Sequence, residues 1–249
     1  MLKKIAERLA LGRTGWDPVP YWRERAKDPE TRSVMWANLA YNELADRDEW
    51  AVIERALPER RDSVLDLGCG TGRMSARLAA AFRSYTGVDL DTMVAEAARR
   101  NPGLADRYVA ATVDSYQYPT DAFDCVLSLA CLAHACSKNS LPGAAGRLVG
   151  TIRRGGRLVL VEPFHTSGLL TRGCRVTPRE VRQLFESLGM KTETHGGILF
   201  VPGRLVLSEQ VFSRFPRATE RAFEAGEVLA RRYPALLSDY AVIVLSKPR

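Results

Sequence analysis

Short apolar runs alternate with stretches of helical periodicity from residue 63 onward. The first run, Val64 to Leu67, follows a polar stretch, as expected for a strand that is buried on both faces. After it, Met74, Leu78 and Phe82 recur at four-residue steps, which indicates an amphipathic helix. Because strands and helices keep alternating, the pattern predicts a parallel sheet with helices on both faces. The strands predicted in this way are Ser63 to Leu67, Tyr85 to Asp89, Tyr108 to Val113, Phe123 to Leu129, Gly156 to Glu162 and Lys191 to His195.

Three alternating glycines, Gly68, Gly70 and Gly72, lie between the first strand and the first helix. They let the backbone turn tightly and let a ligand lie against the main chain. About 20 residues further on, Asp89 ends the next strand, where a doubly wound fold places an acid that binds both ribose hydroxyls.

The chemistry of this turn distinguishes two kinds of nucleotide ligand. A dinucleotide fingerprint has the spacing G-x-G-x-x-G, whereas position 73 here is arginine. In addition, Asp66 stands immediately before the turn, where a carboxylate would repel a pyrophosphate. It would instead attract a ligand that carries a cationic amino group and a sulfonium, because opposite charges at short range in a partly dry site attract strongly.

At this point the chain resembles the class I S-adenosylmethionine-dependent methyltransferases. The resemblance covers roughly Ser63 to Arg249, and its five motifs occur in the family's order. Arg154 stands where the family usually has proline, a change in a turn that affects no functional residue. The motifs are Asp66-Leu67-Gly68-Cys69-Gly70-Thr71-Gly72, Val88-Asp89, Asp114-Ser115, Phe123-Asp124-Cys125-Val126-Leu127-Ser128 and Arg154-Gly155-Gly156-Arg157-Leu158-Val159-Leu160-Val161-Glu162.

The resemblance implies a fold and a cofactor. The fold is α/β, a Rossmann-like, doubly wound sheet of seven mostly parallel strands in the order 3-2-1-4-5-7-6. Its last strand is antiparallel, and Tyr240 to Leu245 is the segment that fits it. The cofactor is S-adenosyl-L-methionine. The cofactor-binding positions carried over are Asp66, Gly68, Cys69, Gly70, Gly72, Asp89, Leu90, Asp114, Ser115, Leu129 and His134.

Methyl transfer needs little covalent help, because a sulfonium is already activated, and a base matters only where the acceptor loses a proton. His134 follows the fourth strand and His165 the fifth, so both are expected at the carboxyl edge of the sheet, where such folds bind ligands. His134 is either a base or a hydrogen-bonded residue that shapes the cofactor pocket. His165 is the second catalytic candidate, although a structural role is favoured for it and for His195. Glu162, which ends the fifth strand, is assigned to the substrate pocket.

Residues 1–62 are predicted to form a helical cap ahead of the methyltransferase domain at 63–249. An amphipathic stretch, Met1 to Leu11, is expected to pack on the domain in preference to lying on a membrane. An irregular aromatic stretch from Pro18 to Trp22 precedes a predicted helix from Pro29 to Leu44. In the family such helices fold over the cofactor, so Trp36 and Tyr41 are candidates for the substrate pocket.

Two features are predicted near the carboxyl terminus. A helix should begin at the capping box Thr177-Pro178-Arg179-Glu180 and stop at Gly189. Residues 197–238 then form an insertion, longer than an ordinary connection, before the last strand. We interpret it first as a lid or pocket wall and second as a packing element, with a dimer contact or a lipid-facing surface as further alternatives.

The composition agrees with one enzyme domain of 249 residues. The net charge of +7 is spread as arginines along the chain, which favours a solvated basic surface over a nucleic-acid footprint. The five cysteines show no C-x-x-C pairing, and Cys131, His134 and Cys136 lack a fourth ligand, so neither disulfides nor a metal is predicted. No apolar run approaches the roughly 20 residues that span a bilayer. A cytoplasmic protein without a transmembrane segment is therefore expected, as a monomer or a homodimer.

The first functional hypothesis is methyl transfer to oxygen or nitrogen of a fairly apolar small molecule, such as a natural product, a lipid or a sugar-containing compound. The alternative is a tRNA-type RNA methyltransferase that uses the basic surface. Against it, the fourth strand ends in Ser128-Leu129-Ala130-Cys131 and not in the Asn-Pro-Pro-Tyr type of clamp, although wobble-base modifiers of the family lack that clamp too. A third hypothesis is a non-catalytic cofactor-binding subunit, against which the intact Asp66, Asp89 and Asp114 argue.

Overall fold

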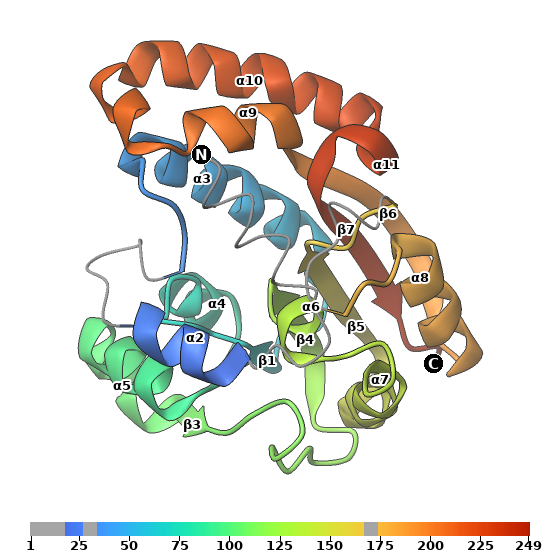
Figure 1. Cartoon of the computed structure of the whole chain (residues 1–249). Coiled ribbons are helices and arrows are strands. Elements are labelled where there is room, and N and C mark those ends of the chain that lie inside the picture. The colour runs from blue at the N-terminus through green and yellow to red at the C-terminus, as the bar shows by residue number, and fades with distance from the viewer. Residues whose placement is uncertain (1–17, 27–33, 167–173) are drawn as a thin grey trace.

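The computed structural model of the chain describes residues 18–26, 34–166 and 174–249 (Figure 1). Within these residues, seven strands form one sheet in the order β3-β2-β1-β4-β5-β7-β6, which confirms the implied topology. Strands β1 to β5 run parallel, and β7 is antiparallel to both of its neighbours. The strands are β1 (Ser63–Leu67), β2 (Ser84–Asp89), β3 (Tyr108–Ala110), β4 (Phe123–Leu129), β5 (Ile152–Glu162), β6 (Lys191–Phe200) and β7 (Ser238–Ser246).

The helices cover both faces of this sheet (Figure 1). They are α2 (Pro18–Arg25), α3 (Leu39–Ala56), α4 (Ser75–Ala81), α5 (Asp91–Arg100), η2 (Pro102–Arg107), α6 (Leu132–Ala135), α7 (Leu141–Thr151), α8 (Pro178–Ser187), α9 (Val201–Leu207), η3 (Gln210–Arg214), α10 (Pro216–Arg232) and α11 (Pro234–Leu237).

Alternate residues of the central strands enter two separate cores. In β1, Leu65 packs in the core that α7 and α8 cover, whereas Val64 packs in the core that α3 and α4 cover. In β5, Leu158 and Val159 are divided between the same two cores. This division explains the runs of consecutive apolar residues at Val64–Leu65 and Leu158–Val161, because each of these residues is buried, whichever face it points to.

Several predicted strand boundaries shift at the sheet edges. The edge strand β3 ends at Ala110 and not at Val113, because Thr112 and Ser115 exchange hydrogen bonds that turn the chain. At the other edge β6 extends to Phe200, since its pairing with β7 continues as far as Phe200 and Ser238.

The amino-terminal predictions need two corrections. The stretch at Pro18 forms α2 instead of an irregular segment, and its prolines fit because the first turn of a helix needs no intrahelical donors. The helix predicted from Pro29 to Leu44 is also wrong in its boundaries, since α3 begins at Leu39. The side chain of Asn38 caps it by accepting from the next backbone N–H groups, and the helix runs on to Ala56. The amphipathic stretch from Met1 to Leu11 lies outside the described residues.

The carboxyl-terminal half contains the predicted α8 with its capping box. The side chain of Thr177 accepts from the backbone N–H of Glu180, and the side chain of Glu180 accepts from the backbone N–H of Thr177. Gly189 follows with a φ of 88°, as a stop signal requires. The insertion at 197–238 consists of the end of β6 followed by α9, η3, α10 and α11, which pack on α3 and β6. Its role as a lid stays a prediction.

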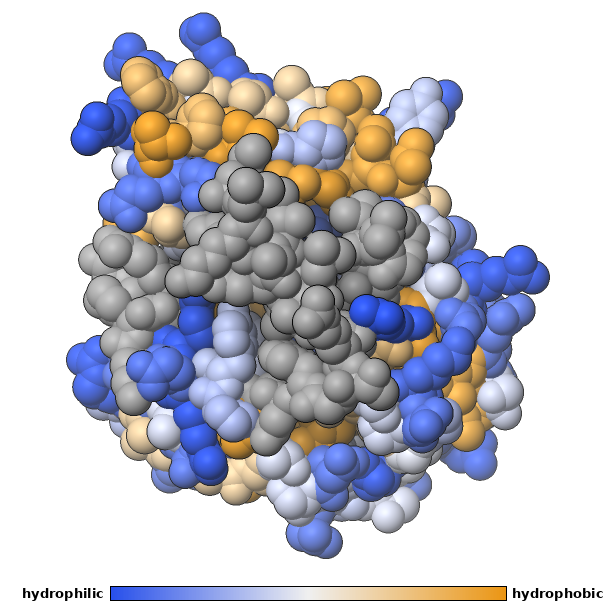
Figure 2. All heavy atoms as spheres, viewed as in Figure 1, coloured by the Kyte–Doolittle hydropathy of each residue, from blue (hydrophilic) through white to orange (hydrophobic). Residues whose placement is uncertain are grey.

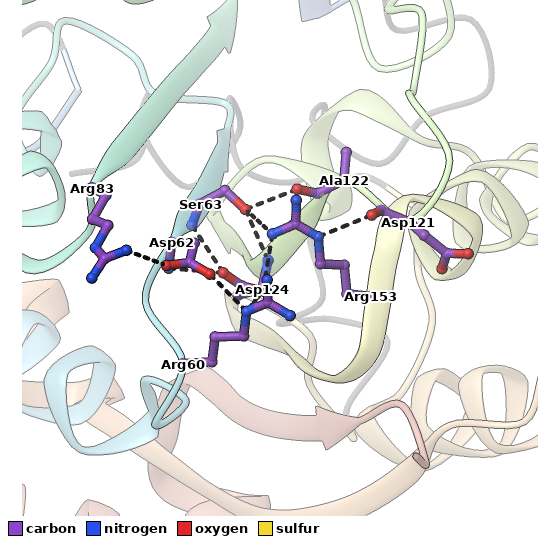
Figure 3. Close-up of polar contacts among 8 residues, drawn as sticks. All are labelled: Arg60, Asp62, Ser63, Arg83, Asp121, Ala122, Asp124 and Arg153. Atoms are coloured by element: carbon purple, nitrogen blue, oxygen red, sulfur yellow. Dashed lines mark hydrogen bonds and ion pairs between the residues drawn. The ribbon is translucent and has the colours of Figure 1, made fainter.

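The amino edge of the sheet is the side at which the parallel strands begin. There a buried carboxylate joins the starts of three strands (Figure 3). Asp124 of β4 accepts hydrogen bonds from the backbone N–H groups of Asp62 and Ser63, at 2.8 and 3.0 Å. It also forms ion pairs with Arg153 at 3.2 Å and Arg60 at 3.3 Å. This cluster ties the starts of β1 and β5 to β4.

Candidate active site

A cavity of ≈ 320 Å³ opens at the carboxyl ends of β1, β2 and β4. The glycine turn after β1, the acid that ends β2 and the residues after β4 contribute to its lining. From outside the sheet, α2 and the segment before α3 also line it. The cavity therefore lies at the edge of the sheet that the sequence predicts for a ligand.

The glycine turn adopts a conformation that other residues would strain. Gly68, Gly70 and Gly72 have φ values of 78°, 56° and 79°. A Cβ on Gly68 would lie 2.3 Å from the Cβ of Cys131, so a side chain there would also clash. The turn is fixed to β2, because the N–H of Gly68 donates to the carbonyl of Val88 at 2.8 Å. These contacts hold the backbone open toward the cavity.

Two acids line the same cavity, the buried Asp66 at the end of β1 and the half-buried Asp89 at the end of β2. Asp66 is only 2% exposed, and it accepts a hydrogen bond from the hydroxyl of Tyr85 at 3.0 Å. Burial raises the pKa of Asp66 to about 7. Burial also raises the pKa of Asp89, although its carboxylate accepts from the N–H groups of Gly70 and Leu90 at 2.8 and 2.7 Å. The site thus holds two desolvated carboxyl groups in positions where a cation and hydroxyl groups would stabilise their charged forms.

An ion-pair cluster ties the glycine turn to α3. Arg73, directly after the last glycine, pairs with Asp46 at 2.5 Å and with Glu49 at 2.6 Å. Both Arg73 and Glu49 line the cavity, and burial raises the pKa of Glu49 despite its arginine partner. Glu49 occupies the buried stripe between Ala45 and Ile53, where an apolar residue would be expected. A carboxylate on the apolar side of a helix is the signal in the sequence that could have identified Glu49.

The segment after β3 forms another wall of the cavity. Asp114 lines it as predicted, together with Thr112 and Val113, and its carboxylate also pairs with Arg147 at 2.6 Å. Ser115 is not part of the lining; its hydroxyl accepts from the N–H of Thr112 and so holds the turn. Of the two residues predicted to face an adenine, only Asp114 reaches the cavity.

His134 lies in α6 and lines the cavity together with Leu129. Its ring stacks edge-on against Trp22 of α2, with centroids 5.6 Å apart. Trp22 also lines the cavity, so α2 covers the imidazole. Contacts of Arg23 with Asp91 at 3.2 Å and of Arg25 with the carbonyl of Met35 at 2.9 Å hold α2 in this position.

Glu162 does not line the cavity. It is fully buried, and its carboxylate accepts from the hydroxyl of Ser128 and from the N–H groups of Cys131, Leu132 and Ala133 at 2.6 to 3.1 Å. Glu162 therefore holds the first turn of α6, which carries His134. Burial still raises its pKa, to about 7.

His165 and Tyr41 are likewise buried away from the cavity. Burial lowers the pKa of His165, whose ring interacts with the backbone of Leu236 in α11. Tyr41 packs between Trp36 and Phe223, with ring centroids 5.3 and 5.5 Å away. Of the three predicted substrate-pocket residues, only Trp36 lines the cavity.

The lining also includes residues that lie outside the sequence motifs and were not predicted. They are Val19, Trp22, Val34, Met35, Glu49, Arg73 and Tyr240. Most belong to segments ahead of β1, whose register could not be read from periodicity. In the described ranges, no group of His, Cys, Asp and Glu could hold a metal ion, and all five cysteines are free. No described helix is long and apolar enough to cross a membrane.

Comparisons with known proteins agree with this geometry. Residues 64–156 match the family model of a methyltransferase domain. An uncharacterized methyltransferase of Mycobacterium tuberculosis is 34% identical over 112 residues, which are 45% of this chain and 55% of the relative. The chain thus spans about half the length of this curated relative. The ubiquinone biosynthesis O-methyltransferase of Methylobacterium nodulans is 26% identical over 191 residues, or 67% of this chain and 76% of that protein.

Solved structures share the fold. A crystal structure of the 4+2 cyclase SpnF has a TM-score of 0.62 and 21% identity, and covers 92% of each chain. The phosphoethanolamine N-methyltransferase 2 of Haemonchus contortus, in complex with S-adenosyl-L-methionine, has a TM-score of 0.58 and 18% identity, and covers 97% of this chain and 60% of its own. At these identities the likeness shows the fold alone. Together with the family match over residues 64–156 and the relatives named as methyltransferases, the shared fold supports a class I S-adenosylmethionine-dependent methyltransferase.

Proposed function

We propose that the chain transfers a methyl group from S-adenosylmethionine to an oxygen or nitrogen atom of a fairly apolar small molecule. The observation that carries this proposal is the pair of acids at neighbouring strand ends in one cavity, the buried Asp66 and the half-buried Asp89. S-adenosylmethionine supplies what both acids lack, namely a cationic amino group, a sulfonium and two ribose hydroxyls. A neutral or anionic ligand would leave Asp66 buried without a counter-charge.

Each cofactor-binding residue has a proposed task. The ionised Asp66 stabilises the positive end of the methionine part, and Asp89 accepts hydrogen bonds from the ribose hydroxyls. The glycine turn presents backbone at close range, and Leu90 and Asp114 face the adenine. The cofactor supplies the activated methyl group when it is bound, and the chain binds, orients and desolvates the reacting groups.

The acceptor is proposed to enter beside the segment that precedes α3. Met35, Trp36 and Tyr240 give this side of the cavity an apolar and aromatic wall. Such a wall favours a fairly apolar acceptor, and four of the relatives are named as O-methyltransferases. Holding acceptor and methyl donor aligned in a dry cavity can supply about 7 to 11 kcal/mol of the barrier.

His134 is the proposed titrating base for an acceptor that must lose a proton. The imidazole lines the cavity under Trp22, and the carboxylate of Glu162 orients it by holding the first turn of α6. In a His134→Ala variant the acidic limb of the pH-rate profile, measured at saturating S-adenosylmethionine so that the pH dependence of cofactor binding does not contribute, should disappear. A variant that keeps the wild-type limbs would leave His134 only the task of shaping the pocket.

The test is transfer of label from methyl-labelled S-adenosylmethionine to a host extract, followed by counting the small-molecule, lipid, RNA and protein fractions. Label in the small-molecule or lipid fraction is expected from the wild type and not from Asp89→Ala. The matched control is Asp106→Asn, which removes an exposed carboxylate outside the cavity and should transfer label normally.

Two results would contradict the proposal. Label released only by ribonuclease would identify an RNA methyltransferase. Cofactor binding without transfer to any fraction would indicate another use of the fold, as the cyclase among the structural neighbours illustrates.

A further inference from the structure

Exposed apolar side chains are concentrated in the insertion that precedes β7. Eight of the eleven large hydrophobic residues that are exposed in the described part of the chain lie between positions 205 and 236. The most exposed are Val228 and Leu236 at 69%, Val211 at 58% and Phe215 at 57%. Exposed apolar residues scattered singly are normal, whereas a concentration in one segment marks a binding surface.

These residues belong to helices that lie side by side. Helices α9, α10 and α11 form the outermost layer at the top of the molecule in Figure 1, and α10 packs against both of the others. Figure 2 shows apolar side chains gathered along this layer, over α9 and α10. We call this layer the α9–α11 face, formed by the exposed side chains of residues 205–236.

Arginines stand among the apolar side chains of this face. Arg214, Arg217, Arg221 and Arg232 are all exposed. Within the described residues, Arg214, Arg217 and Arg221 form no ion pair. Glu224 of α10 pairs with Arg47 of α3 at 3.8 Å. Five exposed arginines on this face, with Arg231 added to the four above, outnumber its two exposed acids, Glu220 and Glu224. Arg231 pairs with Asp48 of α3. The face therefore combines apolar area with a net positive charge.

This combination determines what can cover the face. A second copy docked by twofold symmetry would bring two faces of the same positive charge together, at a Coulomb cost. A nucleic acid would satisfy the arginines, but it would leave the aliphatic side chains without a partner. An anionic lipid surface satisfies both, because its headgroups attract arginine and its acyl boundary accepts apolar side chains.

We propose that the α9–α11 face docks on anionic lipid membranes, with Val211, Phe215, Val228 and Leu236 inserted at the acyl boundary and the arginines among the headgroups. The face is connected to the cavity through α3. Asn38, which caps α3, donates to the carbonyl of Leu207 in α9 at 2.7 Å. Docking goes beyond the proposed function and does not rest on it, since binding can be measured without cofactor or acceptor.

The experiment is co-sedimentation of the full chain with vesicles of phosphatidylcholine alone and of phosphatidylcholine with phosphatidylglycerol. Binding is expected only to the anionic vesicles, and it should weaken as salt is raised. Arg217→Gln with Arg221→Gln should weaken it by roughly 25-fold, about fivefold for each arginine removed. Val211→Ser with Phe215→Ser should weaken it by about tenfold or more.

The matched controls change residues of the same kind outside the face. Leu188→Ser, at a side chain that is 37% exposed, and Arg107→Gln should bind vesicles as the wild type does. Cofactor affinity, measured for every variant, separates loss of the surface from loss of the fold. The proposal is overturned by absence of binding to any vesicle, by face variants that bind like the controls, or by a dimer in sedimentation that the face variants dissociate.

Discussion

The two edges of the sheet each hold a buried aspartate, but only one of them is paired with arginine. At the amino edge Asp124, 1% exposed, meets Arg60, Arg153 and two backbone N–H groups (Figure 3). At the carboxyl edge Asp66, 2% exposed, accepts from the hydroxyl of Tyr85 and forms no ion pair with another described residue. Burial is equal at the two sites, so the difference lies in the partners.

The presence or absence of an arginine partner indicates whether a buried aspartate contributes to stability or to ligand binding. The charge of Asp124 is compensated inside the folded chain, so this acid can stabilise the fold. Burial raises the pKa of Asp66 to about 7, so its ionised form costs free energy until a cation binds beside it. A buried acid that is paired with arginine stabilises the fold, whereas a buried acid without an ion pair is a candidate for binding a ligand.

The largest expected effect is on the carboxyl edge. Asp89→Ala should weaken S-adenosylmethionine binding at least roughly 100-fold, because two hydroxyl groups lose a charged acceptor and each such bond contributes about 1.5 to 3 kcal/mol. Isothermal calorimetry measures this loss. A variant that binds the cofactor as tightly as the wild type would remove Asp89 from the site.

The converse change at the amino edge should affect stability alone. Asp124→Ala leaves Arg153 and two N–H groups without their buried partner, and should lower the free energy of unfolding by about 3 kcal/mol. Urea denaturation measures this value, and cofactor affinity should stay unchanged. The neighbouring Asp62→Ala removes a more exposed carboxylate and should cost much less. Equal losses for the two variants would contradict the assignment.

A smaller effect is expected on the pH dependence of stability. The unfolded chain releases the proton of Asp66 near pH 4, whereas the folded chain keeps it until about pH 7. The folded state therefore binds more protons in this window, and the free energy of unfolding falls as the pH rises from about 5 to 7, by roughly 2 kcal/mol. This value is for Asp66 alone, so Asp66→Asn should remove it, while the similar contribution of Glu162, whose pKa burial also raises to about 7, should remain. Urea titrations at several pH values check this, and an unchanged slope would show that Asp66 is ionised throughout.

The smallest effect should come from the rim of the amino edge. The side chain of Arg83 is 86% exposed, and it reaches Asp62 only at 3.4 Å (Figure 3). An exposed pair of this kind is screened by solvent, so Arg83→Ala should leave thermal unfolding unchanged. A clear drop in the melting temperature would extend the stabilising cluster to the surface.

The sheet and the glycine turn could be predicted because their signals are local. The run from Val64 to Leu67 and the three glycines define β1 and its turn, and the family motifs supply the strand order. The amino-terminal helices were harder, since the start of α3 depends on the cap at Asn38 and not on periodicity.

Site residues outside the motifs could not be predicted, because their positions depend on contacts between segments that are distant in the sequence. Glu162 and His165 both come after or at the end of β5, yet Glu162 turns to the backbone of α6 and His165 to α11. Arg73 and Glu49 enter the site through an ion pair between distant segments. Side-chain direction at a strand end is decided by tertiary packing, which periodicity cannot give.

The most direct test of the central claim is the pH dependence of S-adenosylmethionine affinity. If the cation binds to an ionised Asp66 whose pKa is about 7, affinity should rise about tenfold between about pH 6 and 8 and then level off. Asp66→Asn should bind weakly at every pH, without this rise. Wild-type affinity that is flat across the range, or an Asp66→Asn variant that binds as well as the wild type, would contradict the claim that this acid awaits the cofactor.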